Sequence, residues 1–199
     1  MMDEPLLAVN PLTVELATAA GWIRPVNEVS LWITMGESLS LVGESGSGKT
    51  TLARMILRLI EPDSGEISFE GRSLLALTGS ELRAARRQMQ MVFQDPFASL
   101  NPRMRVGKIV EEPLLIHEPT LTAGDRRQKT AEILRRVGLG DDALRKYPHG
   151  FSGGQRQRIG IARALILKPK LVVADEPVSA LDISVGAQVL LLLQELQQE

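Results

Sequence analysis

The sequence of 199 residues contains no cysteine, which excludes disulfides and cysteine-ligated metal sites. It has no basic surplus either, since 23 Lys and Arg face 24 Asp and Glu, whereas nucleic-acid-binding proteins usually carry a positive excess. No apolar run approaches the roughly 20 residues of a bilayer span, the longest being Val189 to Leu193. The acidic start, residues 1–5, does not resemble a signal peptide. An ordinary globular composition remains, with 44% apolar and 24% charged residues.

The first third of the chain alternates between strand and helix patterns. A helix is predicted after a glycine-rich stretch, with one apolar face, and turn residues end it at 62–65. The predicted apolar face comprises Leu52, Met55, Ile56, Leu59 and Ile60. The predicted strands are Leu6–Val9, Leu12–Leu16, Val29–Ile33, Ser38–Val42 and Glu66–Glu70.

The rest of the chain is mostly helical until a late strand. Between residues 80 and 168, proline and glycine separate predicted helical segments, and residues 170–175 form an apolar strand that ends in acid. A final amphipathic helix is predicted at Ser184–Gln198. The predicted helical segments are Val106–Ile116, Ala123–Val137 and Asp141–Tyr147. Strand–helix alternation with a helical insert predicts an α/β core with a parallel sheet and a helical subdomain.

The segment from Gly43 to Thr50 matches the pattern Gly-x-x-x-x-Gly-Lys-Thr of a phosphate-binding loop, between a predicted strand and a predicted helix. Glycines let the backbone wind so that successive N–H groups point at phosphates, and the helix dipole adds positive potential. Lys49 would place a full charge on the β- and γ-phosphates, and the Thr50 hydroxyl would ligate Mg²⁺. A Gly/Ser turn that only caps a helix is the plainer alternative. The predicted nucleotide-binding residues of this loop are Gly43, Glu44, Ser45, Gly46, Ser47, Gly48, Lys49, Thr50 and Thr51.

Two carboxylates, Asp175 and Glu176, follow the late strand directly. Ligands of parallel α/β sheets bind at the carboxyl ends of the strands, so Asp175 is predicted to lie beside the Mg²⁺ that Thr50 holds. Glu176 is predicted to polarise the water that attacks the γ-phosphate. An acidic pair after a strand is more often a solvated strand end when it stands alone, and the phosphate loop is what favours the functional interpretation.

A third motif distinguishes between phosphate-loop families. The segment Phe151-Ser152-Gly153-Gly154-Gln155 resembles the signature Leu-Ser-Gly-Gly-Gln of ATP-binding cassettes, with Phe at the first position. Ser152 can cap the helix that begins there, and the two glycines would let its amides approach an anion. The motif stands between the phosphate loop and the acidic strand, in the order of that family. The resemblance implies that Ser152, Gly153, Gly154 and Gln155 contact the γ-phosphate held by the opposite subunit.

Further segments support this resemblance over nearly the whole chain. Gln94 resembles the Q-loop glutamine, which implies a role in sensing Mg²⁺ and water and in hinging the helical subdomain. Asp182, in Ser179-Ala180-Leu181-Asp182, resembles the D-loop that crosses the dimer interface. By resemblance, the catalytic residues are Glu176, Gln94 and Lys49, the metal ligands are Thr50, Gln94 and Asp175, and Asp182 joins the nucleotide-binding residues.

The segment from Gln94 to Met104, with Tyr147-Pro148-His149, is similar to the ATPase subunits of bacterial dipeptide, oligopeptide and nickel importers. The resemblance implies ATP and Mg²⁺ as cofactors, a second ATPase subunit (identical or paralogous), membrane permease subunits and, indirectly, a periplasmic binding protein. It implies a peripheral location on the cytoplasmic face of the bacterial inner membrane and no nucleic acid. The implied fold is of the α/β class, a phosphate-loop NTPase core with a parallel sheet, an N-terminal antiparallel β subdomain and a helical subdomain. The chain is then one nucleotide-binding domain, with an ATP-binding core (1–79), a Q-loop and signature subdomain (80–168) and a final part with the acidic strand, D-loop and last helix (169–199).

The resemblance also implies a further strand with a switch histidine after residue 199. Neither His117 nor His149 matches that position, and we expect a C-terminally truncated chain that hydrolyses ATP poorly. The alternative functions are therefore a non-hydrolysing nucleotide-binding fragment and a cassette ATPase outside transport. Gly150 and Gly186 also depart from the residues usual in relatives. Trp22 is a candidate for stacking on adenine, with ordinary loop packing as the alternative.

Overall fold

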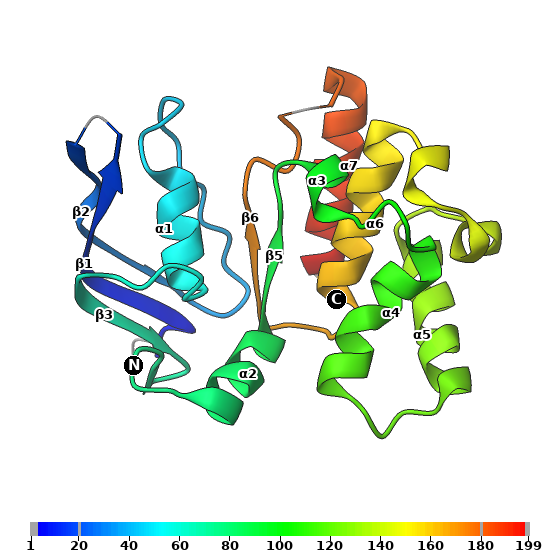
Figure 1. The fold of residues 1–199 in the computed structure, drawn as a ribbon, viewed down its shortest axis with the longest axis horizontal. Coiled ribbons are helices and arrows are strands. Elements are labelled where there is room, and N and C mark those ends of the chain that lie inside the picture. The colour runs from blue at the N-terminus through cyan, green and yellow to red at the C-terminus, as the bar shows by residue number, and fades with distance from the viewer. Residues whose placement is uncertain (1–3, 20, 180, 198–199) are drawn as a thin grey trace. The chain divides into compact units, whose positions relative to one another are not determined.

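The computed structural model describes residues 4–19, 21–179 and 181–197. It divides into two compact units, Met1–Arg86 and Arg87–Glu199, with the boundary inside helix α2 (Gly79–Gln88). Ala180 of the predicted D-loop and Gln198 of the predicted last helix lie outside the described residues. Figure 1 shows strands in both units and most of the helices in the second. The α/β class predicted from the sequence is confirmed.

The first unit contains an antiparallel sheet in the order β2-β1-β3-β4. Its strands are β1 (Leu7–Thr18), β2 (Gly21–Ile33), β3 (Ser64–Phe69) and β4 (Arg72–Ser73). The sequence predicted two separate strands here, but the structure has one continuous strand, β1. A register shift between Val9 and Leu12 accommodates Pro11 without ending the strand. This sheet is the antiparallel N-terminal part that the sequence predicted.

Helix α1 (Lys49–Ile56) follows the phosphate loop and ends earlier than predicted. Arg58 adopts a left-handed φ of 51°, and the N–H groups of Arg58 and Leu59 donate to the carbonyls of Met55 and Arg54. This is a Schellman ending, which closes the helix by satisfying its last carbonyls. Leu59 therefore lies beyond the helix and is exposed, contrary to its predicted place on the apolar face.

The strand predicted at Ser38–Val42 is wrong, since these residues form no strand in the described structure. Leu39, Leu41 and Val42 are exposed, Val42 almost completely at 96%. A strand requires a hydrogen-bonded neighbour, and residues 38–42 join no sheet of the described chain. An apolar sequence pattern therefore did not suffice to form a strand.

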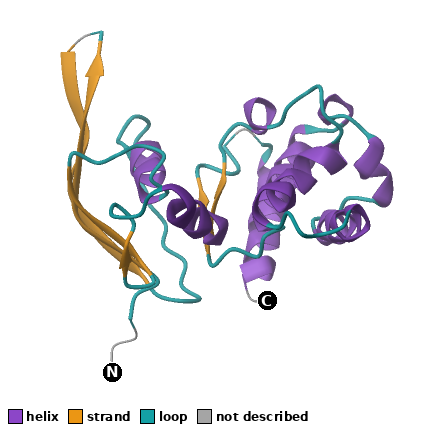
Figure 2. Ribbon diagram, turned by 60° about the horizontal axis from the view of Figure 1, so that its bottom comes forward, coloured by secondary structure: helices purple, strands orange, loops and turns teal. Residues whose placement is uncertain are grey.

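The second unit has a two-stranded parallel sheet and the remaining helices (Figure 2). Strands β5 (Met89–Val92) and β6 (Leu171–Ala174) pair from Met89 with Leu171 to Val92 with Ala174. The sequence predicted β6 but not β5, which lies in the stretch predicted as mostly helical. The α-helices are α3 (Pro96–Ser99), α4 (Val106–His117), α5 (Ala123–Arg136), α6 (Gly153–Leu165) and α7 (Ile183–Gln197), with 3-10 turns η1 (Asp141–Arg145) and η2 (Pro148–Gly150).

The helices of the second unit enclose one hydrophobic core. Among its fully buried members are Val106 and Leu114 of α4, Leu134 of α5, Ile159 of α6 and Val189 of α7. Helices α5 and α6 begin where the sequence predicted. At each start the N-cap residue, Thr122 or Ser152, forms a capping box with the residue three positions further along. The predicted helical subdomain is thus present in α3 to α6.

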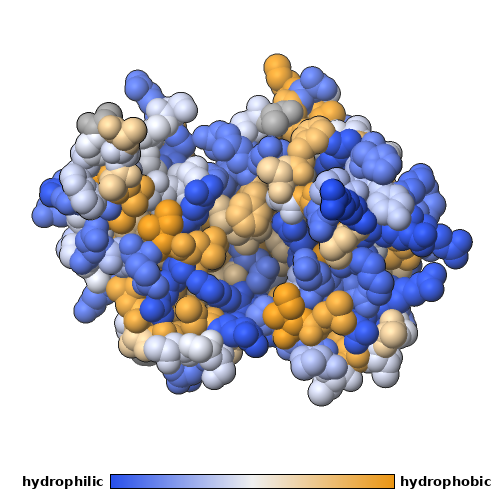
Figure 3. Space-filling view, viewed as in Figure 1, coloured by the Kyte–Doolittle hydropathy of each residue, from blue (hydrophilic) through white to orange (hydrophobic). Residues whose placement is uncertain are grey.

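The face seen in Figure 3 carries apolar side chains in several separate groups among polar ones. Surface of this kind is usual for folded proteins, whose accessible area is largely apolar. Within the described part of the chain, no helix combines the length and the apolar character needed to cross a bilayer.

Candidate nucleotide-binding residues

The phosphate loop of the first unit is an exposed, tightly wound turn. Gly46 and Gly48 have φ values of 83° and 93°, in the left-handed region that glycine adopts without strain. The Ser47 N–H donates to the Glu44 carbonyl, and residues 43–47 are exposed. The sequence therefore folds here as its glycines predict, with the loop backbone open to solvent.

Gly48 is required by packing as well as by its φ. It is the N-cap of α1, and a Cβ atom at this position would lie 2.0 Å from the carbonyl oxygen of Pro25 in β2. This backbone contact fixes the start of α1 against the sheet of the same unit. Sequence reasoning did not identify Pro25 as a support of the loop, because the contact joins two distant segments and involves only backbone.

Lys49 turns back over the loop instead of pointing away from it. Its Nζ donates to the carbonyl oxygens of Gly43 and Glu44, at 2.7 and 2.8 Å. Helix α1 has no acidic residue in its first turn and no side-chain cap, so its positive end is not neutralised there. Thr50 and Thr51, both half-buried, follow in that first turn. The predicted residues thus gather an ammonium, a helix N-terminus and two hydroxyls around one loop.

In the second unit, three predicted residues meet at the end of β6. The Gln94 side-chain amide donates to the Glu176 carboxylate, with Nε2 and Oε2 2.8 Å apart. The same amide lies 3.5 Å from the Ser179 hydroxyl. Asp175 is buried, and its N–H donates to the Val92 carbonyl of β5, which extends the ladder by one bond. The strand end therefore presents one buried and one hydrogen-bonded carboxylate.

The backbone of Glu176 is held in an unusual conformation. Its φ of 43° lies in the left-handed region, which a non-glycine residue adopts only where its surroundings impose it. Ser179 supplies that restraint, because its N–H and its hydroxyl both donate to the Glu176 carbonyl at 3.1 Å. Gln94 and Ser179 together fix both the side chain and the backbone of this carboxylate.

The signature segment forms the start of α6 as predicted. Ser152 is the N-cap: its hydroxyl accepts from the Gln155 N–H at 3.3 Å, and its own N–H donates to Gln155 Oε1 at 3.0 Å. Phe151, which departs from the leucine of the motif, is buried in the hydrophobic core. The structure therefore gives Gln155 a capping role that the resemblance alone did not indicate.

The two signature glycines differ in their surroundings. A Cβ atom at Gly154 would lie 2.3 Å from Cγ1 of Val185 in α7, whereas one at Gly153 would make an ordinary 3.6 Å contact with Leu181. Gly154 therefore permits α6 and α7 to pack closely. Gly186 is also buried, and a Cβ there would lie 3.3 Å from the Cβ of Val178. Exposed Asp182 precedes α7 and accepts the Gly186 N–H through its carbonyl.

The remaining candidates named from the sequence are Trp22 and the two histidines. Trp22 lies in β2, paired with Ala17, and is 74% exposed, so it is not the packed loop residue of the alternative interpretation. His117 is the last residue of α4 and half-buried, while exposed His149 stacks on Tyr147 with ring centroids 5.7 Å apart. Among the described residues no group of three His, Asp or Glu side chains is placed to hold a metal. Such a cluster is not expected for Mg²⁺, which binds one or two carboxylates together with waters and phosphates.

Comparison with known proteins identifies similar chains. The chain is 57% identical to the dipeptide transport ATP-binding protein DppF of Lactococcus lactis over 98% of its length and 64% of the relative's. It is 51% identical over its whole length to a probable peptide ABC transporter ATP-binding protein of Sinorhizobium fredii, of which it covers 58%. The structure is similar to the dimeric ATP-binding cassette MJ0796 bound to ADP and Pi, with a TM-score of 0.86 and 32% sequence identity. The match covers 96% of this chain and 83% of that chain.

The chain thus spans about three fifths of the length of the peptide-transport relatives it matches. A family model described as ABC transporter matches residues 26–179, which includes the phosphate loop, Gln94, the signature segment and Glu176. Because that match covers most of the chain and agrees with both the relatives and the fold, the chain belongs to the ABC transporter family.

Proposed function

We propose that this chain is the ATP-binding subunit of an importer that takes up peptides or related solutes. The observation that carries the proposal is the phosphate loop, in which Lys49 and the uncapped start of α1 surround an exposed turn. The names of the relatives, which are peptide-transport ATP-binding proteins, support the transport assignment. They favour it over a cassette ATPase that acts outside transport and over a fragment without turnover.

Nucleotide binding is assigned to the first unit. The N–H groups of Gly43 to Thr51 would surround the phosphates, and Lys49 would exchange its two carbonyl acceptors for phosphate oxygens. The exchange is favourable because an ammonium binds an anionic oxygen more strongly than a neutral carbonyl. Trp22 is the proposed adenine contact, supported by its exposure on β2.

Mg²⁺ is the proposed metal, with oxygen ligands from Thr50, Asp175 and Gln94. When bound, it would neutralise charge on the β- and γ-phosphates. Burial of Asp175 beside β5 restricts that carboxylate to a narrow range of positions, which suits a metal ligand. This set of few protein oxygens is what Mg²⁺ uses in phosphoryl-transfer sites.

Glu176 is the proposed general base, and Gln94 the residue that orients the attacking water. The 2.8 Å hydrogen bond between them supports this pairing, because it fixes the carboxylate while leaving acceptor positions for a water. Catalysis in such sites comes mainly from positioning and electrostatic stabilisation, so the restraint of the Glu176 backbone by Ser179 is part of the assignment.

The proposed assembly is a dimer of this chain with an identical or paralogous subunit, bound to permease subunits at the cytoplasmic face of the bacterial inner membrane. The dimeric form of the structural neighbour supports the first part. In this dimer, Ser152, Gly153, Gly154 and Gln155 of one chain would contact the γ-phosphate on the other, with Asp182 near the interface. A periplasmic binding protein would deliver the cargo to the permease, and no nucleic acid takes part.

A binding measurement tests the nucleotide assignment. A fluorescent ATP analogue titrated with Mg²⁺ should bind the wild-type chain, and Lys49→Ala should weaken binding at least about 100-fold, because a charge-assisted phosphate contact contributes about 3 kcal/mol. Lys146→Ala, which removes an exposed ammonium paired with Asp142 in the second unit, is the control and should bind normally. Wild-type affinity in Lys49→Ala would refute the assignment.

A further inference from the structure

Side chains of helix α6 contact both ends of residues 93–99, the segment that carries Gln94. The Gln157 side-chain amide donates to the Phe93 carbonyl, directly before Gln94, with Nε2 and O 3.5 Å apart. Six residues further along α6, the Arg163 guanidinium donates to the Ser99 carbonyl at 2.6 Å. Both acceptors are backbone atoms, so these contacts fix the course of the chain through residues 93–99.

A third side chain of the same helix holds the middle of the segment. The Arg156 guanidinium lies 4.0 Å from the centre of the Phe97 ring, a close cation–π contact. Arg156 Nε also donates to the Pro148 carbonyl at 2.8 Å. Because one guanidinium contacts both Phe97 and the turn before the signature, the segment is linked to the start of α6 as well as to its body.

Two of these donors are shielded from water, Gln157 fully and Arg163 in part, and the hydrogen bonds to their acceptors offset that cost. Gln157 is 2% exposed, and a buried side-chain amide is normally retained only with hydrogen-bond partners. Burial lowers the pKa of the Arg163 guanidinium, and the nearby Glu112 carboxylate opposes this effect. Arginine stays charged at neutral pH, so half-buried Arg163 keeps its charge where it donates to the Ser99 carbonyl.

We propose that Gln157 and Arg163 are positioning residues that aim the Gln94 side chain at Glu176. They do so by making residues 93–99 one rigid body with α6, whose N-terminus is the signature segment. The proposal rests on the proposed function, in which Gln94 and Glu176 act on Mg-ATP. It adds that a displacement of Ser152, at the start of α6, would move Gln94 of the same chain because both belong to one rigid body. This coupling does not require strand β6.

Amide hydrogen exchange measures this restraint directly in the whole chain. Arg163→Met should accelerate exchange of the amides between Gln94 and Asn101 about tenfold, because the opening of a segment that loses a charged hydrogen bond becomes about that much more frequent. Gln157→Leu should act in the same direction. Arg158→Met is the matched control, since Arg158 is on the same helix but donates to Val137 and Gln188. Unchanged exchange in Arg163→Met and Gln157→Leu would overturn the proposal.

A thermodynamic cycle distinguishes positioning from simple loss of packing. The ratio of Mg-ATP affinity to metal-free ATP affinity should fall by the same factor in Gln94→Ala, in Arg163→Met and in the double variant, because all three remove one effect. Arg163→Lys, which keeps a donor, should restore most of the ratio. Additive losses in the double variant would refute the positioning role. If wild-type chain binds no ATP, the proposed function fails, and the exchange measurement alone decides the inference.

Discussion

At the scale of single residues, Gly154 shows that a motif glycine can be needed for packing. A Cβ atom there would lie 2.3 Å from Cγ1 of Val185, a β-branched side chain on a facing helix. We expect Gly154→Ala to destabilise the fold by about 1–3 kcal/mol, the usual cost of overpacking. Urea unfolding followed by circular dichroism measures the change.

Two further variants control this prediction. Nothing lies within 4 Å of a Cβ atom at Gly150, so Gly150→Ala should change stability by less than about 0.5 kcal/mol. Val185→Ala removes the clashing methyl groups, and the double variant should be more stable than the sum of both single changes. Strict additivity would show that Gly154 is needed for its backbone and not for the approach of α7.

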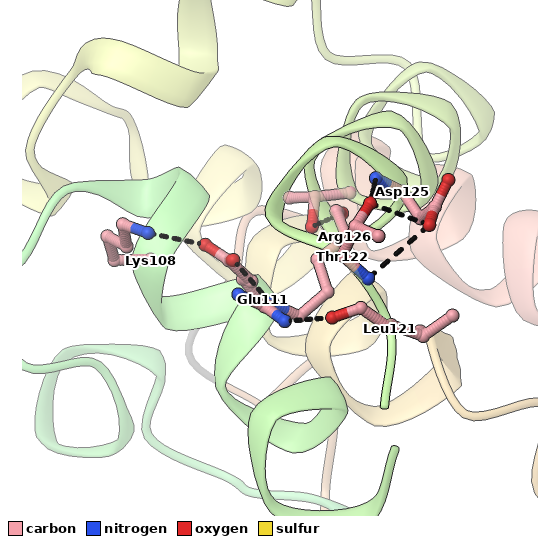
Figure 4. A network of polar contacts seen from close by, with 7 residues as sticks. Lys108, Glu111, Leu121, Thr122, Asp125 and Arg126 are labelled. Atoms are coloured by element: carbon pink, nitrogen blue, oxygen red, sulfur yellow. Dashed lines mark hydrogen bonds and ion pairs between the residues drawn. The ribbon is translucent and has the colours of Figure 1, made fainter. Parts of the chain in front are cut away.

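At the scale of elements, the hairpin of α4 and α5 depends on one buried carboxylate. Glu111 of α4 is 6% exposed, and it accepts hydrogen bonds from Lys108 Nζ at 2.8 Å and from Arg126 Nε at 2.9 Å. Arg126 also donates to the Leu121 carbonyl, and Thr122 and Asp125 form the capping box of α5 (Figure 4). The network therefore joins α4 to the first turn of α5 through Arg126.

This network makes stability depend on pH. Burial raises the pKa of Glu111, but hydrogen bonds and charges from Lys108 and Arg126 outweigh it, so the pKa lies below its ordinary value of 4.5. A carboxylate whose pKa is lower in the folded than in the unfolded protein stabilises the fold at pH values above its unfolded pKa. This stabilisation is lost as the pH falls through its folded pKa. Glu111→Gln should cost about 2 kcal/mol at pH 7 and less at pH 3, as measured by urea unfolding at both pH values.

The matched control for this pH dependence is Glu132→Gln, which changes an exposed carboxylate on α5. It should leave the stability nearly unchanged at pH 7 and at pH 3, because an exposed carboxylate contributes little. An equal cost of Glu111→Gln at both pH values would contradict the assignment, because it would show that the ionised form is not what stabilises the hairpin.

The elements also show what the sequence could predict. The start of α6 was predicted because Ser152 is a capping residue, and α5 was predicted from a helical stretch bounded by proline and glycine. The strand at Ser38–Val42 was wrong and β5 was missed, because strands depend on distant partners that a local pattern does not name. The phosphate loop was recognisable residue by residue, whereas the contacts of Gln157 and Arg163 with residues 93–99 had no sequence signal.

At the scale of the whole molecule, the proposed function makes assembly depend on nucleotide. In Glu176→Gln the new amide oxygen can still accept the hydrogen bond from Gln94, so the loop should keep its geometry while losing the carboxylate that would activate water. ATP would then bind without being consumed, and the dimer it closes should persist. Light scattering after size exclusion should show a dimer of Glu176→Gln with Mg-ATP and a monomer without it.

The control for the assembly prediction is a variant that cannot bind nucleotide. The closed dimer should require bound ATP, and a neutral residue at position 176 alone should not produce it. Adding Lys49→Ala to Glu176→Gln removes the ammonium that holds the Gly43 and Glu44 carbonyls and would bind the phosphates. The double variant should therefore stay monomeric at every Mg-ATP concentration at which the single variant dimerises. If both variants dimerise equally, the dimer arises from another surface. If Glu176→Gln binds ATP but never dimerises, the signature segment does not belong to the proposed site.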